Sequence, residues 1–361
     1  MPNRAPLRFN ALLFLLVNLL TANVLADTVH DSAQPLPALQ VDLSDVSVSG
    51  LSSGAFMTVQ LYVANSGIMT GAAVIAGGPY LCARSWELQA NITTATTSCM
   101  NPLTAAVGPN TPALLQLTET LAANGSIDPI SNLRNDHLYL FSGEADQVVT
   151  RLVMDQTYQY FLGLGLPAES IDYVTNVDAG HAFITNNGNE NACDITQSPF
   201  INDCDLDQAT QLLKQLYPDL KPAKKDKHKL SGDIVTFDQA EFIDSDYTSM
   251  SEDAFVYIPA QCYQGGCRLH VAIHGCLQGY KVIDDAYYTQ TGYNPVADAN
   301  NIVVLYPQVQ PSSKEPFNPQ GCWDFWGYSQ PDSAEPDYYS KQAPQLKALR
   351  AMIDRLGQAV D

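Results

Sequence analysis

The stretch Gly50-Leu51-Ser52-Ser53-Gly54 decides the fold class of this chain. It fits the pattern G-x-S-x-G, in which a serine lies on a sharp turn between a strand and a helix. Upstream, Val46 and Val48 alternate with serines as in a strand, and residues 55–64 downstream predict a helix. A plain Gly/Ser turn is the alternative interpretation, so the pattern needs partners elsewhere in the chain.

The glycines of this stretch let the backbone turn sharply and leave space around the serine. Ser52 is then expected at the N-terminus of the following helix, where backbone N–H groups can face a negatively charged oxygen. This position suits a serine nucleophile, because its attack on a carbonyl group creates such an oxygen.

Residues 1–26 have the features of a secretory signal peptide. Arg4 and Arg8 form a basic start, residues 11–20 are apolar except for one asparagine, and Val24-Leu25-Ala26 is a small-residue cleavage site. The apolar run is too short for a membrane span, and no later stretch is long and apolar enough. We expect a secreted protein, with the periplasm as the alternative location, whose mature residues 27–361 form a single domain.

The chain is strongly acidic. Its net charge at pH 7 is -20, from 38 acidic and 18 basic residues, and removal of the two signal-peptide arginines shifts it to -22. Such acidity argues against nucleic acids and anionic membranes as partners and leaves neutral substrates open.

The eight cysteines predict disulfide bonds, because an even number behind a signal peptide is typical of proteins from oxidising compartments. A metal site is the alternative, but the sequence contains no C-x-x-C pair. Proximity in the sequence suggests the pairs Cys82–Cys99, Cys193–Cys204, Cys262–Cys267 and Cys276–Cys322.

Short apolar runs alternate with helical patterns along the chain, which predicts a mainly parallel sheet flanked by helices. A basic segment at 221–229 interrupts this alternation and predicts a surface linker near residues 221–232. The predicted strands are residues 71–76, 137–141, 171–174, 254–258, 268–273 and 302–306, and helices are predicted at 148–162 and 343–356.

A serine becomes a nucleophile when a histidine takes its proton and a carboxylate orients that histidine. His181 is the best candidate for this base, because it lies in a Gly-His turn just after a predicted strand. The other histidines lie near the mature N-terminus, in the linker, or on or beside predicted strands: His30, His228, His137, His270 and His274.

Asp146 is the predicted carboxylate, because it follows the strand at 137–141 after a short glycine-containing loop. Glu144 and Asp178 are the nearest alternatives. The resulting order along the chain is serine, acid, histidine, which is the order expected of α/β-hydrolases.

The developing negative charge on the substrate oxygen needs N–H donors. The N–H of Ser53, directly after the nucleophile, is one candidate. The other is the N–H of Cys276, in the His274-Gly275-Cys276 turn that follows a predicted strand. Only the backbone of Cys276 would act, which leaves its sulfur free for a disulfide.

Together these motifs resemble secreted poly(3-hydroxybutyrate) depolymerases of the single-domain, circularly permuted type. The resemblance covers roughly residues 41–328 and is carried by residues 50–55, the Ser-Gly-x-x-Asp of Ser142 to Asp146, Gly180-His181, and Ile273-His274-Gly275-Cys276-Leu277-Gln278. It implies Ser52 as nucleophile with Asp146 and His181, and Ser53 and Cys276 as oxyanion donors. Many relatives carry a separate polymer-binding domain after a linker, and none is visible in this sequence.

The order of the segments indicates a circularly permuted α/β-hydrolase fold, stabilised by disulfides. In the usual order the oxyanion-loop strand precedes the nucleophile strand, whereas here the strand at 268–273 comes late in the chain. The final helix would lead back into the nucleophile strand, and the linker near 221–232 would join what are normally the two termini. Permutation of this kind is tolerated where such termini lie close together at the surface.

A neutral, apolar polyester would be held by apolar contacts rather than by charge. The resemblance implies that residues 322–326 line the substrate crevice, which makes Trp323 and Trp326 candidate substrate-binding residues. Tyr287, Tyr288 and Tyr293 are further possible contacts, with core packing as the alternative role for at least half of these aromatic residues.

These observations lead us to expect a serine esterase that cleaves poly(3-hydroxybutyrate)-type polyester through an acyl-enzyme and needs no metal or cofactor. Short 3-hydroxyacid oligomers or monomers would be its products. An esterase for small soluble or aryl esters is the first alternative. A non-catalytic polymer-binding protein with the same fold is the second.

Overall fold

An eight-stranded sheet forms the centre of the protein. The structure is a computed structural model that describes Met1 and residues 33–188, 190–222 and 229–360, and the contacts from residue 33 onward form one compact unit. The strand order across the sheet is β4-β3-β2-β1-β10-β11-β9-β8. The strands are β1 (Val46–Leu51), β2 (Met69–Ile75), β3 (His137–Phe141), β4 (Ile171–Val174), β8 (Asp233–Asp238), β9 (Asp253–Ile258), β10 (Arg268–Ile273) and β11 (Ile302–Tyr306).

The sheet is mainly parallel, as predicted. All neighbours from β4 to β11 run parallel, whereas β9 pairs antiparallel with both β11 and β8. Each predicted strand is present with bounds within two residues, and β8 was not predicted because its sequence is only partly apolar. The fold class expected from the sequence is confirmed.

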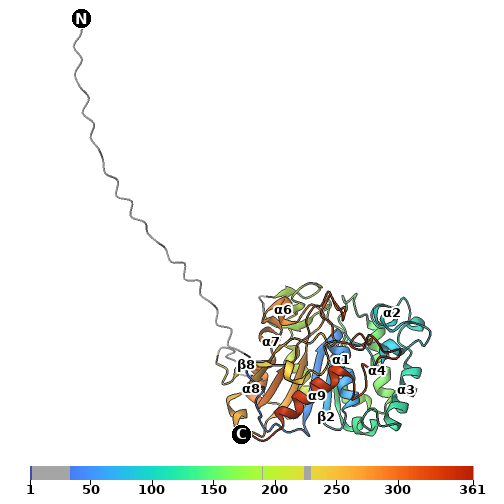
Figure 1. Cartoon of the computed structure of the whole chain (residues 1–361), viewed down its shortest axis with the longest axis horizontal. Helices are drawn as coiled ribbons and strands as arrows, with labels where there is room; N and C mark the ends of the chain where they lie inside the picture. Colours follow the sequence, from blue (N-terminus) through green and yellow to red (C-terminus); the bar gives the residue numbers. More distant parts are fainter. Residues whose placement is uncertain (2–32, 189, 223–228, 361) are drawn as a thin grey trace. The chain divides into compact units, whose positions relative to one another are not determined.

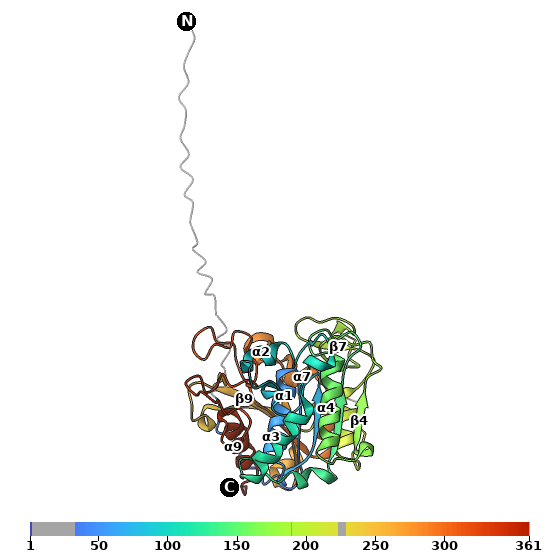
Figure 2. The ribbon, with the colours of Figure 1, turned by 90° about the vertical axis from the view of Figure 1, so that its right-hand side faces the viewer.

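Both faces of the sheet are covered by helices (Figures 1 and 2). One face packs on α1 (Ser53–Ala64), α3 (Thr111–Ala123), α4 (Arg151–Gly163) and α9 (Pro344–Leu356), and Figure 1 shows α9, in red, beside α1, in blue. The other face packs on α5 (Gln208–Leu216), α7 (Ala286–Gln290) and α8 (Tyr293–Asn300). The short helices α2 (Asn91–Thr96) and α6 (Tyr280–Ile283) and a small parallel sheet of β5 (Phe183–Thr185), β7 (Ile201–Asp203) and β6 (Asn191–Ala192) complete the fold.

The serines of β1 are buried, although alternation with valine usually marks a strand with one face in water. Ser47 and Ser49 contact the two ring nitrogens of His270 on β10, with oxygen–nitrogen distances of 2.6 and 2.7 Å. The hydroxyl of Tyr293 on α8 lies 2.6 Å from the Ser49 hydroxyl. Burial lowers the pKa of His270 to about 3, so the ring is neutral and can donate from one nitrogen and accept at the other.

The end of the final helix contacts the segment just before β1, as the permuted order predicts. The N–H groups of Leu39 and Val41, just before β1, both donate to the carbonyl oxygen of Leu356 at the end of α9, over 3.1 Å. The final helix therefore leads back toward β1, as expected. The predicted linker near 221–232 is described only at 221–222 and 229–232, and the predicted signal peptide at 1–26 lies almost entirely outside the described residues.

The four disulfides suggested by sequence proximity are all present. They join Cys82 to Cys99, Cys193 to Cys204, Cys262 to Cys267 and Cys276 to Cys322. Within the described residues, no helix has the length and apolar character needed to cross a membrane.

Candidate active site

The turn between β1 and α1 holds Ser52 in a strained conformation. Its φ is 58° and its ψ is -124°. Residues other than glycine rarely adopt this backbone conformation, and where they do it often marks a functional site. A Cβ atom on Gly54 would lie 2.3 Å from the carbonyl oxygens of Ile273 and His274, and one on Gly50 would lie 2.3 Å from the Gly54 oxygen. The two glycines of the motif are therefore required by the close approach of β10 and α1.

His181 and Asp146 form a buried pair. The Nδ1 atom of His181 lies 2.8 Å from Oδ2 of Asp146. The other carboxylate oxygen accepts the N–H groups of Val148 and Val149 over 2.8 and 3.1 Å. Because an ionised carboxylate can only accept hydrogen bonds, the imidazole donates to Asp146 from Nδ1. The other ring nitrogen, Nε2, then has no proton and can accept one.

Ser52 and His181 line the same small cavity of about 120 Å³. The serine directly follows β1, Asp146 follows β3, and the histidine follows β4, so all three lie beyond the carboxyl ends of parallel strands. Ligands of open α/β sheets bind at this edge. The alternative acids, Glu144 and Asp178, are exposed.

Two backbone N–H groups are available beside Ser52. Within the described chain, neither the N–H of Ser53 nor that of Cys276 donates to a protein acceptor. A Cβ atom on Gly275 would lie 3.2 Å from the Cβ of Ser52, which places the turn at 274–276 against Ser52. The sequence predicts these two N–H groups as oxyanion donors.

The His274 side chain orients the turn that carries Cys276. Its Nδ1 atom lies 2.7 Å from the carbonyl oxygen of Gly275, and its Nε2 atom accepts the N–H of Val309 over 3.2 Å. Burial lowers the pKa of His274 to about 4, so the ring is neutral and donates from Nδ1. Because the C=O and N–H of one peptide unit point in opposite directions, this bond directs the Cys276 N–H away from the His274 ring.

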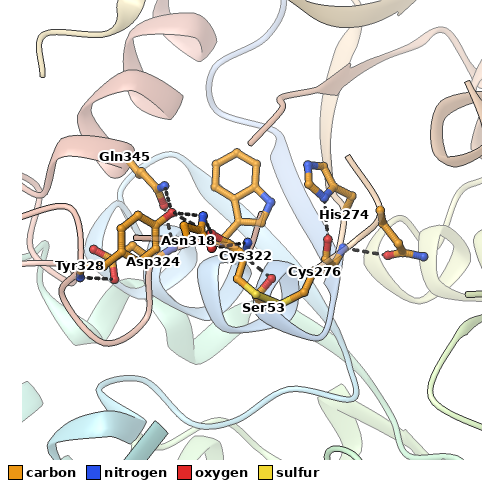
Figure 3. Close-up of a disulfide and its surroundings, with 11 residues drawn as sticks. Ser53, His274, Cys276, Asn318, Cys322, Asp324, Tyr328 and Gln345 are labelled. Atoms are coloured by element: carbon orange, nitrogen blue, oxygen red, sulfur yellow. Dashed lines mark hydrogen bonds between the residues drawn. A yellow bond between two sulfur atoms is a disulfide. The ribbon is translucent and has the colours of Figure 1, made fainter. Parts of the chain in front are cut away.

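The disulfide between Cys276 and Cys322 ties this turn to the loop at 318–329 (Figure 3). Figure 3 shows Ser53 beside the disulfide, where its hydroxyl oxygen accepts the N–H of Trp323 over 3.2 Å. Directly after the disulfide, the N–H of Leu277 donates to the carbonyl oxygen of Gln320 over 2.7 Å. The turn at 274–276, the start of α1 and the 318–329 loop are thus held together.

A buried carboxylate holds the 318–329 loop in shape. One oxygen of Asp324 accepts the N–H groups of Trp326, Gly327 and Tyr328, and the other accepts the N–H and hydroxyl of Ser329. Burial raises the pKa of Asp324, and the bonds from Ser329 oppose that shift. These five donors fix the turn that presents the Trp326 side chain.

A cleft of about 390 Å³ opens beside Ser52. Trp326 lines it, as the sequence suggested, whereas Trp323 does not. The side chain of Trp323 is fully buried and its ring packs 5.7 Å from that of His274, so its prediction as a substrate contact is corrected to a core residue. The cleft is lined mainly by apolar side chains: Phe56, Ile92, Met100, Val149, Phe317, Pro319, Phe325 and Trp326.

The tyrosines considered as contacts belong to the core. Tyr287 and Tyr293 are fully buried, and Tyr288 is partly buried and stacks on Phe255 at a ring distance of 4.0 Å. Phe56 and Met100 also line the cleft and were not predicted from the sequence. Phe56 lies four residues after Ser52 at the start of α1, so its spacing from the nucleophile was the available signal.

Comparison with known proteins identifies close relatives. No protein-family model matches the chain. The chain is 41% identical over 333 residues to a poly(3-hydroxybutyrate) depolymerase of Delftia acidovorans, with 91% of the chain and 63% of that protein covered. It is 35% identical over 346 residues to a polyhydroxybutyrate depolymerase of Talaromyces funiculosus, with 91% and 93% covered.

Solved structures agree with these sequence relatives. The crystal structure of the PHB depolymerase from Penicillium funiculosum superposes with a TM-score of 0.79 at 32% identity, over 90% of this chain and 99% of that one. A PHB depolymerase complexed with an R3HB trimer superposes with a TM-score of 0.77 at 31% identity and the same coverage.

Proposed function

The chain belongs to the polyhydroxybutyrate depolymerase family, and we propose that it hydrolyses polyesters of the poly(3-hydroxybutyrate) type. The observation that carries this proposal is the site itself. Ser52 and the paired His181 and Asp146 meet at one edge of the sheet, beside a largely apolar cleft. The structural neighbour that holds an R3HB trimer supports the choice of substrate class.

The chemistry begins with the hydroxyl of Ser52. His181 takes the hydroxyl proton at Nε2 as the oxygen attacks the ester carbonyl, and Asp146 stabilises the resulting imidazolium. The imidazolium then gives the proton to the leaving alkoxide, which departs as an alcohol. Water hydrolyses the acyl-enzyme by the same route and releases a 3-hydroxyacid monomer or oligomer.

The oxyanion of the tetrahedral intermediate would lie between the N–H groups of Ser53 and Cys276. Both groups are free of protein acceptors in the described chain and are fixed in place before substrate arrives. A prearranged donor of this kind typically contributes about 2.7–4 kcal/mol to transition-state stabilisation.

The cleft suits a neutral polyester chain. Its wall of aromatic and aliphatic side chains gives contact area without charge, which matches repeating units of ester and methyl groups. Two of its apolar residues, Ile92 and Phe317, are exposed by 46% and 69%. They provide apolar surface at the mouth of the cleft for contact with solid polymer.

We further propose that the protein is secreted. Four disulfides join all eight cysteines of the chain, and structural disulfides persist mainly in oxidising compartments. The predicted signal peptide agrees with this location. Detection of the protein in the culture medium, with a new N-terminus at Asp27, tests both statements.

A clearing assay on polymer granules tests the proposed activity. The wild-type protein should clear a poly(3-hydroxybutyrate) suspension, and Ser52→Ala should leave it turbid while folding normally. Rates on tributyrin, measured in parallel, distinguish a polymer hydrolase from an esterase for small soluble esters. Cleavage of tributyrin alone would contradict the polymer assignment.

A further inference from the structure

A second cavity, of about 610 Å³, adjoins the cleft beside Ser52. The two share Ile92 and Trp326 as lining residues. The second cavity has a different chemistry, because charged and amide side chains take the place of apolar ones: Arg84, Glu87, Gln89, Asn91 and Glu335. Its volume lies within the usual range for ligand sites.

Arg84 is the only lysine or arginine among the described lining residues of the two cavities. Its guanidinium lies 5.8 Å from the ring centre of Tyr339, and its Nη1 atom donates to the Tyr339 hydroxyl over 3.4 Å. Tyr339 is held in turn by Tyr80, whose hydroxyl donates to the Tyr339 carbonyl oxygen over 2.7 Å. Arg84 is half-buried and, among described residues, forms no salt bridge, so it is an oriented cation without a carboxylate partner.

Neutral donors accompany this cation. The carbonyl oxygen of the Gln89 side chain accepts the hydroxyl of Thr94 over 3.0 Å, which leaves its NH2 group available. Asn91 adds a second side-chain amide to the lining of the cavity. Glu87 and Glu335 also line the cavity, but both are exposed, so water screens their charges more strongly than that of Arg84.

A chain of poly(3-hydroxybutyrate) carries one charged group, the carboxylate at one end. Its internal units are neutral and would gain nothing from an arginine, whereas an arginine binds a carboxylate through two parallel hydrogen bonds. The protein as a whole carries a charge of -20 and repels free acids. A carboxylate that reaches this cavity therefore needs a local cation.

The geometry points to this cavity as the binding site for the terminal carboxylate of a polyester chain or oligomer, with Arg84 as its ion-pair partner. The inference rests on the proposed function. In such a chain the carboxyl end always lies on the alcohol side of the ester that is cleaved. A chain bound through Arg84 would thus release a short oligomer with a free carboxylate from this cavity.

Binding of a defined oligomer tests the inference without turnover. The probes are the (R)-3-hydroxybutyrate trimer as free acid and as its terminal methyl ester, titrated by calorimetry into the full chain carrying Ser52→Ala. The free acid should bind about tenfold more tightly than the ester, as expected for a hydrogen-bonded ion pair. Adding Arg84→Gln should abolish this preference, and Arg84→Lys should retain part of it.

Arg350→Gln is the matched control, because it removes one positive charge on α9, where Arg350 is paired with Asp354. It should leave the preference for the acid intact. Equal binding of acid and ester, absence of free-acid binding, or a preference that survives Arg84→Gln would overturn the inference.

Turnover by the Ser52 enzyme separates this inference from the proposed function. If the acid preference depends on Arg84 but neither trimer nor polymer is hydrolysed, the carboxylate site is supported and the proposed function fails. If polymer is cleared but acid and ester are bound and cleaved alike, the proposed function stands and the carboxylate site is rejected.

Discussion

Asp146 determines which nitrogen of His181 carries the proton. Its Oδ1 atom is occupied by the N–H groups of Val148 and Val149, so only Oδ2 faces the ring. In Asp146→Asn the same two N–H groups should keep the amide oxygen, and the NH2 group would then face Nδ1 of His181. The ring would be forced to carry its proton on Nε2, where it cannot accept the serine proton.

We therefore predict that Asp146→Asn lowers kcat on tributyrin by about 10⁴-fold, the usual loss when the tautomer is wrong. Its urea unfolding midpoint should stay close to that of the wild type. Glu144→Gln, at the exposed neighbouring carboxylate, is the control and should keep its activity. Loss of activity in Glu144→Gln with full activity in Asp146→Asn would instead identify Glu144 as the catalytic acid.

Asp136, directly before β3, couples stability to pH. Burial raises the pKa of its carboxyl group to about 7, and the group accepts the Tyr62 hydroxyl over 2.9 Å. In the unfolded chain this carboxyl ionises near pH 4. Between these values the folded state holds one proton more than the unfolded state, so this group lowers stability as pH rises from about 4 to 7.

Asp136→Asn should remove that contribution, since an amide stays neutral and can still accept the Tyr62 hydroxyl. The variant should gain a few kcal/mol of unfolding free energy relative to the wild type at pH 8, and little at pH 4. Urea unfolding of both proteins at the two pH values measures the difference. A variant that is less stable than the wild type at pH 8 would show that the ionised carboxylate is needed.

Trp323 and Trp326 show what the sequence could not predict about the site. Ser52, Asp146 and His181 each follow a predicted strand, so the topology of a parallel sheet already predicts that they lie at one edge. The two tryptophans lie three residues apart in an irregular loop. Such a loop has no periodicity from which a buried side chain could be told from an exposed one. Asp324 accepts five hydrogen bonds that turn the chain between the two tryptophans, so that one side chain is buried and the other lines the cleft.

At the scale of elements, the Cys276–Cys322 disulfide joins two segments that both line the cleft. Its loss would free the turn at 274–276, which carries the proposed oxyanion donor, from the 318–329 loop. We predict that Cys276→Ser with Cys322→Ser lowers kcat on tributyrin by about 10²-fold, the scale of one displaced oxyanion donor. Closing a loop of 46 residues also contributes about 4 kcal/mol, so unfolding should be measured alongside.

The Cys262–Cys267 disulfide is the matched control. It lies between β9 and β10, at the opposite end of β10 from the turn at 274–276. Its two cysteines are only 5 residues apart in the sequence. Serine at both positions should cost about 2 kcal/mol of stability and leave kcat unchanged. Equal losses of kcat in the two double variants would argue against a special role for the Cys276–Cys322 bond.

The elements that were hard to predict share one property. The buried parallel strands are continuous apolar runs and stand out in the sequence. The strands β5, β6 and β7 have only two or three residues each and pair within one disulfide-bonded loop region, so no periodicity can develop. Tertiary pairing, rather than local pattern, creates them.

At the scale of the whole molecule, the chain order and the spatial order differ. The end of α9 is hydrogen-bonded to residues 39–41, just before β1, so these two segments lie side by side. We predict that a permuted chain starting at Lys229, passing from residue 361 through a flexible linker to residue 33, and ending at Pro222 folds and clears polymer granules. Permutation is tolerated at such surface sites.

The thermal midpoint and kcat of this permuted chain, compared with those of the original, measure the outcome. A chain opened inside the sheet, between β10 and β11, is the control and should be strongly destabilised. An insoluble permuted chain would show that residues 223–228 do more than connect two segments.

The pairing of β1 with β10 also has a consequence for biosynthesis. Ser47 and His270 are 223 positions apart, yet they touch in the finished protein. A ribosome completes the first four strands well before it makes β10, so the inner edge of β1 waits without a neighbour during most of translation. The central pairing of the sheet thus joins segments that lie far apart in the chain, and contacts of such high sequence separation slow folding.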